Sequence, residues 1–511
     1  MNGAESLIRA LASAGCDVCF ANPGTSEMHL VQAIDKTPAM RAVLALFEGV
    51  CTGAADGFGR MTGRPAATLL HLGAGLGNGV ANLHNARRAG TPLVNVVGDH
   101  AIHHVAYDAP LTSDIAGVAK PVSSWIRSAR TSESLAQDGR DAVRAALTPM
   151  PNPLGNVSTL IVPADCAWGT GHEVNGGLDV PKRSRVPDDV VKGLALDRDT
   201  ILLIDGEALS AAGIEAAGRI AAATGCKLYS PTFPARVECG PSLPAVTRLP
   251  YFPEQVLETL KPIRRLVLAG AEAPVSFFAY RDQPSDLVPD GCTVVRLAHR
   301  HEAIVDALER VADRLGGKAA PRGGAQRPES PAGAISTANV ARILAREMPE
   351  SSIVAVDSGG GGAAYPVLQR AVRHTWLNLT GGSIGQGGPV ATGAAVACPD
   401  RRVFALLGDG GSMYTIQCLW TQAREKLDVV TVIFSNRSYN ILEVEYRRLG
   451  IKEIGATAAS LFDLGNPEID FVGLAKSMGV PGARAATCEA FADALGVALN
   501  ARGPFLIQVD L

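Results

Sequence analysis

The chain has 511 residues, of which 47% are apolar, 19% are charged and 55 are glycine. This length exceeds what one hydrophobic core usually covers, so we expect three domains. A formal net charge of −3 excludes the basic footprint of a nucleic-acid or anionic-membrane binder, and no uncharged apolar run reaches the length of a membrane span.

The N-terminal residues MNGAESLIRALASAG predict an amphipathic helix, not a signal peptide, because they contain neither a basic n-region nor an apolar h-region. The ten cysteines include one C-x-x-C pair, Cys16 and Cys19, but no second pair or histidine follows at zinc spacing. We therefore expect buried, reduced thiols in a cytoplasmic protein.

Short apolar runs alternate with helical patterns along the whole chain, which is typical of parallel sheets covered by helices. The expected strands fall into three sets: 17–21, 42–47, 67–72, 92–98 and 158–164; 200–206, 227–231, 265–270 and 293–298; 352–359, 376–382, 402–410, 429–436 and 504–511. The fold class is therefore α/β, with three doubly wound parallel-sheet domains. We place them at residues 1–170, 185–315 and 334–511, with an exposed Gly/Pro-rich linker at 316–333.

The strongest local pattern lies in the last third, where a strand at 402–407 ends in Gly-Asp-Gly. A helix at about 414–425 and a second strand then lead to Asn436. A right-handed parallel crossover brings Asp409 and Asn436 to the same sheet edge, where their oxygens suit Mg²⁺ or Ca²⁺ completed by phosphate oxygens and water. A plain surface turn is the alternative for Asp-Gly alone. Three glycines would let a diphosphate approach the backbone: Gly408, Gly410 and Gly411.

Residues 404–440 resemble the thiamine-diphosphate (ThDP) binding motif, which begins with GDG and ends in an asparagine after the next strand. The resemblance implies that the side chains of Asp409 and Asn436 and the backbone carbonyl of Ser438 bind Mg²⁺. Counting back from Asp409 along LTGGSIGQGGPVATGAA places at Ile384 the bulky aliphatic residue that bends the cofactor into a V shape. The diphosphate would lie against Gly408, Gly410, Gly411, Ser412, Ser358 and Gly359.

Glu48 follows the expected strand 42–47 and begins a helix. Its surroundings, LALFEGVCTGAADGFGRMTGRPA, are similar to the strand–Glu–helix segment of the ThDP enzymes. The resemblance implies that Glu48 hydrogen-bonds the aminopyrimidine and activates the cofactor. A first-turn glutamate favoured by the helix dipole is the alternative. In this family the glutamate of one subunit meets the metal site of another, which implies an obligate homo-oligomer, either a dimer or a dimer of dimers.

The N-terminal loops are similar to those of benzoylformate decarboxylases. Thr25, in ANPGTSEMHL, stands at the position of a substrate-contacting serine, and His71, in LLHLGAGLGN, at that of a catalytic histidine. A satisfied histidine at a strand end is the alternative for His71.

A second histidine of those decarboxylases has no counterpart in the stretch 271–284, where Phe278 or Ala279 stands instead. The loop 98–108 offers His100, His103 and His104, whose His-His pair is similar to one in pyruvate decarboxylases. These imidazoles would protonate an intermediate or bind a carbonyl, and simple solvation is the alternative.

As a whole, the chain is similar to short proteins of the acetolactate synthase large-subunit type. That resemblance implies decarboxylation of a pyruvate-like 2-oxo acid and ligation of the product fragment to a second carbonyl, with ThDP and Mg²⁺ as cofactors. Simple decarboxylation of the benzoylformate type is the alternative. Many of those synthases hold FAD in the central domain, but no motif of this chain bears on FAD.

Three further classes are less well supported by the residues or are excluded by them. Gly73, Gly75 and Gly77 follow a strand, as in a nicotinamide dehydrogenase, but their spacing is not G-x-G-x-x-G. A P-loop ATPase is excluded because no G-x-x-x-x-G-K-[ST] occurs. A non-catalytic partner protein with the ThDP-enzyme fold is the other alternative, although every expected cofactor group is present.

Overall fold

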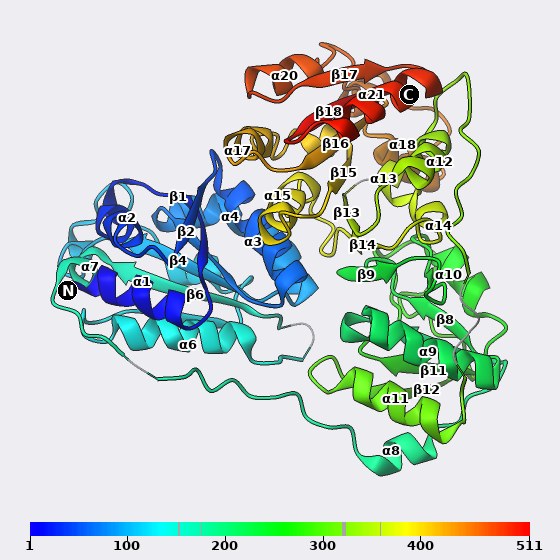
Figure 1. The fold of residues 1–511 in the computed structure, drawn as a ribbon, viewed down its shortest axis with the longest axis horizontal. Coiled ribbons are helices and arrows are strands. Elements are labelled where there is room, and N and C mark those ends of the chain that lie inside the picture. Colours follow the sequence, from blue (N-terminus) through cyan, green and yellow to red (C-terminus); the bar gives the residue numbers. More distant parts are fainter. Residues whose placement is uncertain (152–153, 175, 319–322, 358) are drawn as a thin grey trace.

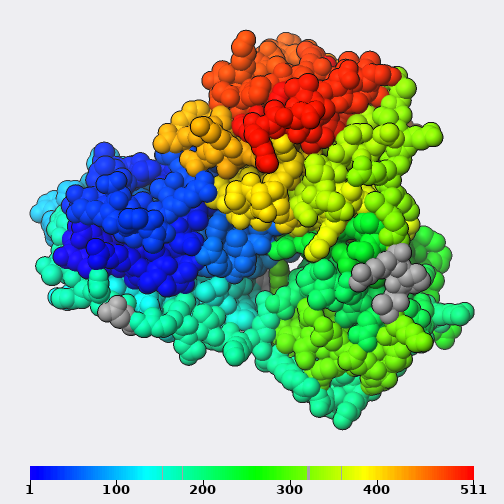
Figure 2. Space-filling model, viewed as in Figure 1, coloured from blue at the N-terminus to red at the C-terminus, as the bar shows by residue number. Residues whose placement is uncertain are grey.

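The computed structural model describes residues 1–511 except 152–153, 175, 319–322 and 358. Within these residues the strands form three sheets that are wholly or mostly parallel, which confirms the expected α/β fold class. Each sheet forms a lobe of the molecule, coloured blue to cyan, green, and yellow to red (Figures 1 and 2). We call these the first, second and third lobes.

The first lobe contains a parallel sheet with the strand order β2-β1-β3-β4-β6-β5. Its strands are β1 (Val18–Asn22), β2 (Arg41–Leu44), β3 (Ala66–Leu70), β4 (Leu93–Asp99), β5 (Trp125–Ser128) and β6 (Val157–Pro163). Its helices are α1 (Gly3–Ser13), η1 (Thr25–Glu27), α2 (Met28–Asp35), α3 (Glu48–Thr62), α4 (Leu72–Ala89), η2 (Val105–Tyr107), α5 (Ile115–Ala119), α6 (Leu135–Leu147) and α7 (Ala164–Trp168). The predicted N-terminal helix is thus confirmed as α1.

The second lobe contains a parallel sheet with the order β10-β8-β7-β11-β12. Its strands are β7 (Thr200–Ile204), β8 (Lys227–Ser230), β10 (Thr247–Arg248), β11 (Arg265–Ala269) and β12 (Thr293–Ala298). Its helices are α8 (Asp188–Gly193), η3 (Gly206–Leu209), α9 (Ala211–Thr224), α10 (Pro253–Leu260) and α11 (Ile304–Arg314).

The third lobe contains a sheet with the order β17-β18-β16-β15-β13-β14-β9, in which only the β14–β9 pairing is antiparallel among the described strands. Its strands are β9 (Arg236–Cys239), β13 (Ser352–Val356), β14 (His374–Leu377), β15 (Val403–Gly408), β16 (Val429–Ser435), β17 (Gly482–Ala485) and β18 (Phe505–Asp510). Its helices are α12 (Thr337–Glu347), α13 (Gly359–Gly362), α14 (Tyr365–Leu368), α15 (Gly387–Ala397), α16 (Asp409–Ser412), α17 (Cys418–Arg424), α18 (Asn440–Arg448), α19 (Ala456–Phe462), α20 (Phe471–Ser477) and α21 (Cys488–Asn500).

Several elements differ from the sequence prediction. The helix expected at about 414–425 is wrong in extent, because a short α16 starts at Asp409 and α17 begins only at Cys418. Strands β5, β9, β10 and β17 were not expected. They are two to four residues long and mostly only half-buried, so they carry little apolar periodicity.

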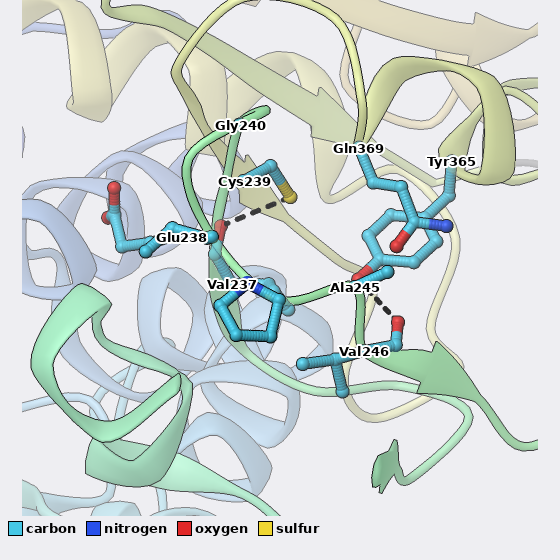
Figure 3. Close-up of a pocket in the computed structure, with 10 residues that line it drawn as sticks. Val237, Glu238, Cys239, Gly240, Ala245, Val246, Tyr365 and Gln369 are labelled. Atoms are coloured by element: carbon cyan, nitrogen blue, oxygen red, sulfur yellow. Dashed lines mark hydrogen bonds between the residues drawn. The ribbon is translucent and has the colours of Figure 1, made fainter. Parts of the chain in front are cut away.

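Strand β9 comes from the segment between β8 and β10 of the second lobe, yet it extends the third sheet through β14 (Figure 1). At this seam a small pocket is lined by β9 and by Tyr365 of α14, whose hydroxyl donates to the carbonyl of Val246 at 3.2 Å (Figure 3). The antiparallel pairing and this hydrogen bond join the second lobe to the third.

The first and third lobes meet where α3 crosses α15. A Cβ on Gly57 would lie 2.1 Å from the carbonyl oxygen of Val390, and one on Gly393 would lie 1.8 Å from that of Ala54. Glycine is therefore required at both positions, because the two helix backbones touch. One hydrophobic core cluster continues across this crossing.

Helix α3 also contains a buried ion pair between the polar residues of the ADGFGR segment, Asp56 and Arg60. Its Oδ2–Nη2 distance is 2.5 Å. Arg60 also donates to the carbonyl of Asn378 in the third lobe (2.6 Å) and to that of Ala235 beside β9 (3.1 Å). This guanidinium thus connects α3 of the first lobe to the loop after β14 and to the residue that precedes β9. Among the described residues, no helix is long and apolar enough to cross a membrane.

Candidate functional site

The first four strands of the parallel first sheet end at one edge, and the candidate residues of this lobe follow those ends. Thr25 lies just after β1, Glu48 is the first residue of the helix after β2, and His71 is the residue after β3. His103 lies in the loop after β4. Ligands of open α/β sheets bind at this carboxyl edge, so the topology brings the predicted residues to the expected side.

Glu48 is 9% exposed at the start of α3. The side-chain amide of Asn78 on α4 donates to its Oε2 at 3.0 Å. A Cβ on Gly75 would lie 3.1 Å from Oε1, so this glycine leaves room for the carboxylate. A nearly buried carboxylate with one donor among the described residues retains capacity to accept another hydrogen bond.

His71 has a partner that the sequence did not indicate. Its Nδ1 lies 2.8 Å from Oε2 of Glu27, which is fully buried. The Ser26 hydroxyl lies 3.2 Å from the same Nδ1 and donates to Glu27 Oε1 at 2.5 Å. The carboxylate and hydroxyl fix the orientation of the ring at Nδ1, which leaves Nε2 for proton exchange.

Two signals accompany Glu27 in the sequence. It occupies the third position after Gly24 in a GTSE turn, where a glutamate returns to accept a hydrogen bond from the Gly24 N–H (2.7 Å). Gly98 at the end of β4 is the second, since a Cβ there would lie 1.9 Å from Glu27 Oε1. Thr25 itself is exposed beside this cluster, and the hydroxyl that reaches His71 belongs to Ser26.

The loop histidines lie at the same edge but outside this cluster. His103 and His104 are exposed. His103 Nδ1 is 3.7 Å from Asp165, and the ring of His104 lies 5.3 Å from that of His100 and 5.7 Å from that of Tyr107, centroid to centroid. The structure therefore does not bring the His-His pair against Glu48 or His71 within the described chain.

At the edge of the third sheet, the two predicted metal-binding segments meet. Asp409 follows β15, and its Oδ2 accepts the backbone N–H of Arg437 at 2.6 Å. Asn436 follows β16, and its Oδ1 accepts the N–H of Ser438 at 3.2 Å. Burial raises the pKa of Asp409, opposed by backbone N–H donors. Asp409 and the segment that begins at Asn436 thus meet at the carboxyl ends of neighbouring strands.

Glycines shape the space around this edge. A Cβ on Gly410 would lie 2.2 Å from the Tyr439 ring, so only glycine fits there. The hydroxyl of Ser412 donates to the carbonyl of Asp409 at 2.8 Å and closes the turn that starts at Gly408. A Cβ on Gly411 would lie 3.7 Å from Cβ of Ile384, which places that side chain over the turn.

Ile384 lies on the loop between β14 and α15, which Asp357 at the end of β13 holds in place. Oδ2 of Asp357 accepts the N–H groups of Gly385 (3.2 Å) and Gly387 (3.0 Å), while its buried Oδ1 has no partner in the described residues. Burial raises the pKa of Asp357 to about 6. Gly359 begins α13 beside it, whereas Ser358 lies outside the described residues.

Helix α4 contacts both candidate regions at separate points. Asn78 donates to Glu48, whereas Asn85 donates to the carbonyl of Ser383 at 2.8 Å and accepts the N–H of Gly381 at 3.1 Å. Seven residues of helix correspond to about 10 Å. The loop that carries Ile384 is therefore attached to this chain's α4 well away from the Glu48 carboxylate.

The donor set fits a hard divalent cation with a diphosphate. In the described part of the chain no group of three or more His, Cys, Asp or Glu side chains could hold a metal by itself. Asp409, Asn436 and the Ser438 carbonyl are instead hard oxygen donors that need phosphate oxygens and water to complete six ligands. The glycine turn and the partnerless Oδ1 of Asp357 border the space such a group would fill.

Comparisons with known proteins agree with the presence of one candidate region in the first lobe and another in the third. Residues 1–118 match the family described as "Thiamine pyrophosphate enzyme, N-terminal TPP binding domain", and residues 360–509 match its "C-terminal TPP binding domain". A curated relative from Mycobacterium tuberculosis named "Putative acetolactate synthase large subunit IlvX" is 49% identical over all of this chain and 99% of its own length. A benzoylformate decarboxylase from Pseudomonas aeruginosa is 28% identical, covering 97% of this chain and 96% of its own.

A solved structure of similar fold is the thiamine diphosphate-dependent 4-hydroxybenzoylformate decarboxylase of Rhodococcus jostii RHA1. It superposes with a TM-score of 0.87 over 100% of this chain and 99% of its own, at 24% identity, which concerns the fold alone. The two matched domains and the full-length relative decide the assignment. This chain belongs to the thiamine pyrophosphate enzymes and is of the acetolactate synthase and benzoylformate decarboxylase type that acts on 2-oxo acids.

Proposed function

We propose that this protein decarboxylates a 2-oxo acid with ThDP anchored by Mg²⁺. The proposal rests on one observation, namely that the two sheet edges carry different chemical groups. The edge of the first sheet places one nearly buried carboxylate, Glu48, beside a histidine, and the edge of the third sheet collects oxygen donors around a glycine turn.

The residues that would hold the cofactor are those of the third edge. Asp409, Asn436 and the Ser438 carbonyl would bind the metal, and Ile384 would support the cofactor rings. The diphosphate would lie along the glycine turn: Gly408, Gly410, Gly411, Ser412 and Gly359. When bound, ThDP supplies a nucleophilic carbon for the 2-oxo group and accepts the electron pair released with CO₂.

Glu48 would exchange a proton with the aminopyrimidine. Its carboxylate accepts from Asn78 and is shielded from water, so a positioned donor on the cofactor would meet an acceptor that needs little reorganisation. This matches the role that the resemblance implies for Glu48.

Assembly would complete the site, because Glu48 and the Ile384 loop are held at separate points of α4. We propose a homodimer, or a dimer of dimers, in which Glu48 of one subunit faces Asp409 of the next. Mixing the inactive variants Glu48→Gln and Asp409→Asn would then restore roughly a quarter of the wild-type turnover, since half of the subunit pairs regain one intact site. No recovery after subunit exchange, verified by native mass spectrometry, would contradict a shared site.

The Glu27–His71–Ser26 cluster favours protonation as the fate of the decarboxylated fragment. Glu27 and Ser26 engage Nδ1 of His71, so Nε2 would deliver a proton and release an aldehyde. The full-length relative named as an acetolactate synthase favours a second candidate, in which a second 2-oxo acid takes the place of the proton.

Product analysis distinguishes these candidates. Protein reconstituted with ThDP and Mg²⁺ is incubated with pyruvate and, separately, with benzoylformate, and CO₂ and the organic product are followed. Aldehyde in equal amount to CO₂ supports the decarboxylase, and acetolactate from pyruvate supports the ligase. Absence of CO₂ from a panel of 2-oxo acids, with cofactor binding intact, would overturn the proposed function.

A further inference from the structure

Four aromatic residues of the second lobe form a continuous cluster, which we call the aromatic wall: Phe233, Tyr251, Phe277 and Phe278. They lie in the segments after β8, β10 and β11, at the carboxyl edge of the second sheet. Ring centroids are 5.8 Å apart for Phe233 and Phe277, 5.3 Å for Tyr251 and Phe277, and 4.8 Å for Phe277 and Phe278. These distances and tilted or edge-on geometries are those of stabilising aromatic pairs.

The wall borders the loop that carries Ile384. A Cβ on Gly382 would lie 2.7 Å from Cζ of Phe277, so the tip of this ring touches the loop backbone. Gly382 has φ +79°, in the left-handed region that favours glycine. The wall is therefore continuous with the candidate cofactor site, two residues before Ile384.

Residues next to the wall contact α18, the helix that follows the proposed metal-binding loop. The hydroxyl of Tyr280 donates to Glu445 of α18 at 3.0 Å. Arg448 of α18 pairs with Glu254 through both carboxylate oxygens (2.5 and 3.0 Å) and lies over the Tyr280 ring at 4.7 Å. The charges of Glu445, Arg448 and Glu254 beside the wall are thus engaged with one another.

Two rings of this packed cluster remain accessible. Phe277 is 41% and Phe278 is 55% exposed, although both pack against other rings. Burial raises the pKa of the neighbouring Tyr251 to about 12, which indicates an apolar environment. Accessible aromatic side chains on a fixed support, next to a cofactor site, are typical of a surface that binds an apolar group.

We propose that the aromatic wall selects 2-oxo acids with an aryl or similarly bulky apolar side chain over pyruvate. This inference rests on the proposed function and names its substrate class. An aryl group would cover Phe277 and Phe278 edge to face, whereas a methyl group leaves both rings in water.

The test compares kcat/KM for benzoylformate and pyruvate in the reconstituted holoenzyme. We expect benzoylformate to be preferred by at least about tenfold. Phe277→Ala should reduce this preference by about tenfold or more, and Phe277→Leu, which keeps apolar area without a ring, by less. Trp168→Ala serves as the control, because Trp168 is 49% exposed and packs against His29 in the first lobe. Thermal stability and ThDP affinity of each variant verify folding.

A preference for pyruvate, or a substrate ratio that Phe277→Ala leaves unchanged, would overturn the proposal. If neither acid releases CO₂, decarboxylation of these acids fails while the wall is still tested by binding. Calorimetric titration of the holoenzyme with mandelate and lactate, which differ by the same phenyl-for-methyl exchange, should then favour mandelate by about tenfold in wild type and not in Phe277→Ala. Equal affinities would count against the wall.

Discussion

The carboxyl edges of the first and third sheets have the same topology but carry different kinds of groups. In both, strand ends of a parallel sheet converge, but the first edge presents ionisable side chains: Glu48 and Glu27, which are buried, and His71, which is half-buried. The third edge presents a backbone turn in which Gly410 leaves no room for a side chain, with oxygen donors around it. Proton transfer requires side chains in a shielded place, whereas binding a diphosphate requires backbone amides and a metal.

Replacement of Glu48, the proposed activating carboxylate, should produce the largest effect, and it tests whether the first edge takes part in proton transfer. Glu48→Gln should lower kcat about 10³-fold, since an amide cannot take part in proton exchange. ThDP affinity should change little. Glu133→Gln, at an exposed position just before α6, is the matched control. Unchanged turnover in Glu48→Gln would remove Glu48 from the mechanism.

The buried Asp56–Arg60 ion pair, which lies where the lobes meet, is expected to contribute to stability. Arg60→Ala leaves the Asp56 carboxylate buried without its ionic partner and removes the hydrogen bonds to Asn378 and Ala235, so it should cost about 3–5 kcal/mol of stability. Arg64→Ala, which breaks an exposed pair with Asp17, should cost less than about 1 kcal/mol. Thermal unfolding of the two variants checks this. Equal losses of stability would show that the buried ion pair stabilises the fold no more than the exposed pair.

At the third edge, Asp409→Asn should weaken ThDP binding in the presence of Mg²⁺ by roughly 100-fold, as expected for loss of a charged ligand. Fluorescence titration with and without EDTA measures the effect. Chelation should bring wild type to the level of the variant, while Asp493→Asn, on the exposed side of α21, should behave as wild type. Binding that ignores both the metal and the substitution would exclude Asp409 as a ligand.

At the first edge, Glu27→Gln should lower kcat about 10- to 100-fold, because the amide no longer holds His71 in the same protonation and orientation. The diagnostic readout is the pH profile of kcat, whose acid or base limb should move. Thr25→Val should have a smaller effect, since Thr25 is exposed beside the cluster. A lower kcat with an unmoved profile would indicate a purely structural role for Glu27.

The smallest effect concerns Asp357 beneath the third edge. Burial raises the pKa of Asp357 to about 6, above its ordinary value of about 3.9. Between these two pH values the folded chain keeps a proton that the unfolded chain releases. Its contribution to stability therefore falls as the pH rises from about 4 to about 6 and stays low above that. Asp357→Asn should be more stable than wild type by on the order of 1 kcal/mol at pH 7.5, with the difference vanishing near pH 4.

Thermal unfolding of the cofactor-free proteins at several pH values tests this. His374, whose pKa burial lowers to about 4, acts in the opposite direction, because it must gain a proton as the pH falls. It is present in both proteins, so their difference isolates Asp357. A difference independent of pH would show that Asp357 ionises normally in the folded chain.

Much of the fold followed from local pattern. Apolar runs with helical spacing between them predicted the long central strands of all three sheets, because a strand buried on both faces must be apolar throughout. Short edge strands such as β17, with its two half-buried residues and one exposed residue, contain no such pattern. The seam strand β9 also depends on a partner more than a hundred residues away, β14, which periodicity does not reveal.

Likewise, some residues of the candidate site could be predicted from the sequence and others could not. The proximity of Asp409 and Asn436 followed from the handedness of a parallel crossover, a rule that needs only the order of strands. Glu27 was missed because its burial depends on Gly98 at the end of another strand. Asp357 was missed because its two N–H donors belong to a loop about thirty residues further on, whose conformation the sequence does not reveal.

The sequence by itself determined the order of the three lobes, the family and the residues with the right chemistry at strand ends, because periodicity, turn composition and motif spacing are local properties. Only the tertiary structure decided which of those residues meet. It paired His71 with Glu27, joined β9 to the third sheet and placed Phe277 against Gly382, since contacts between distant segments depend on how whole sheets and helices pack.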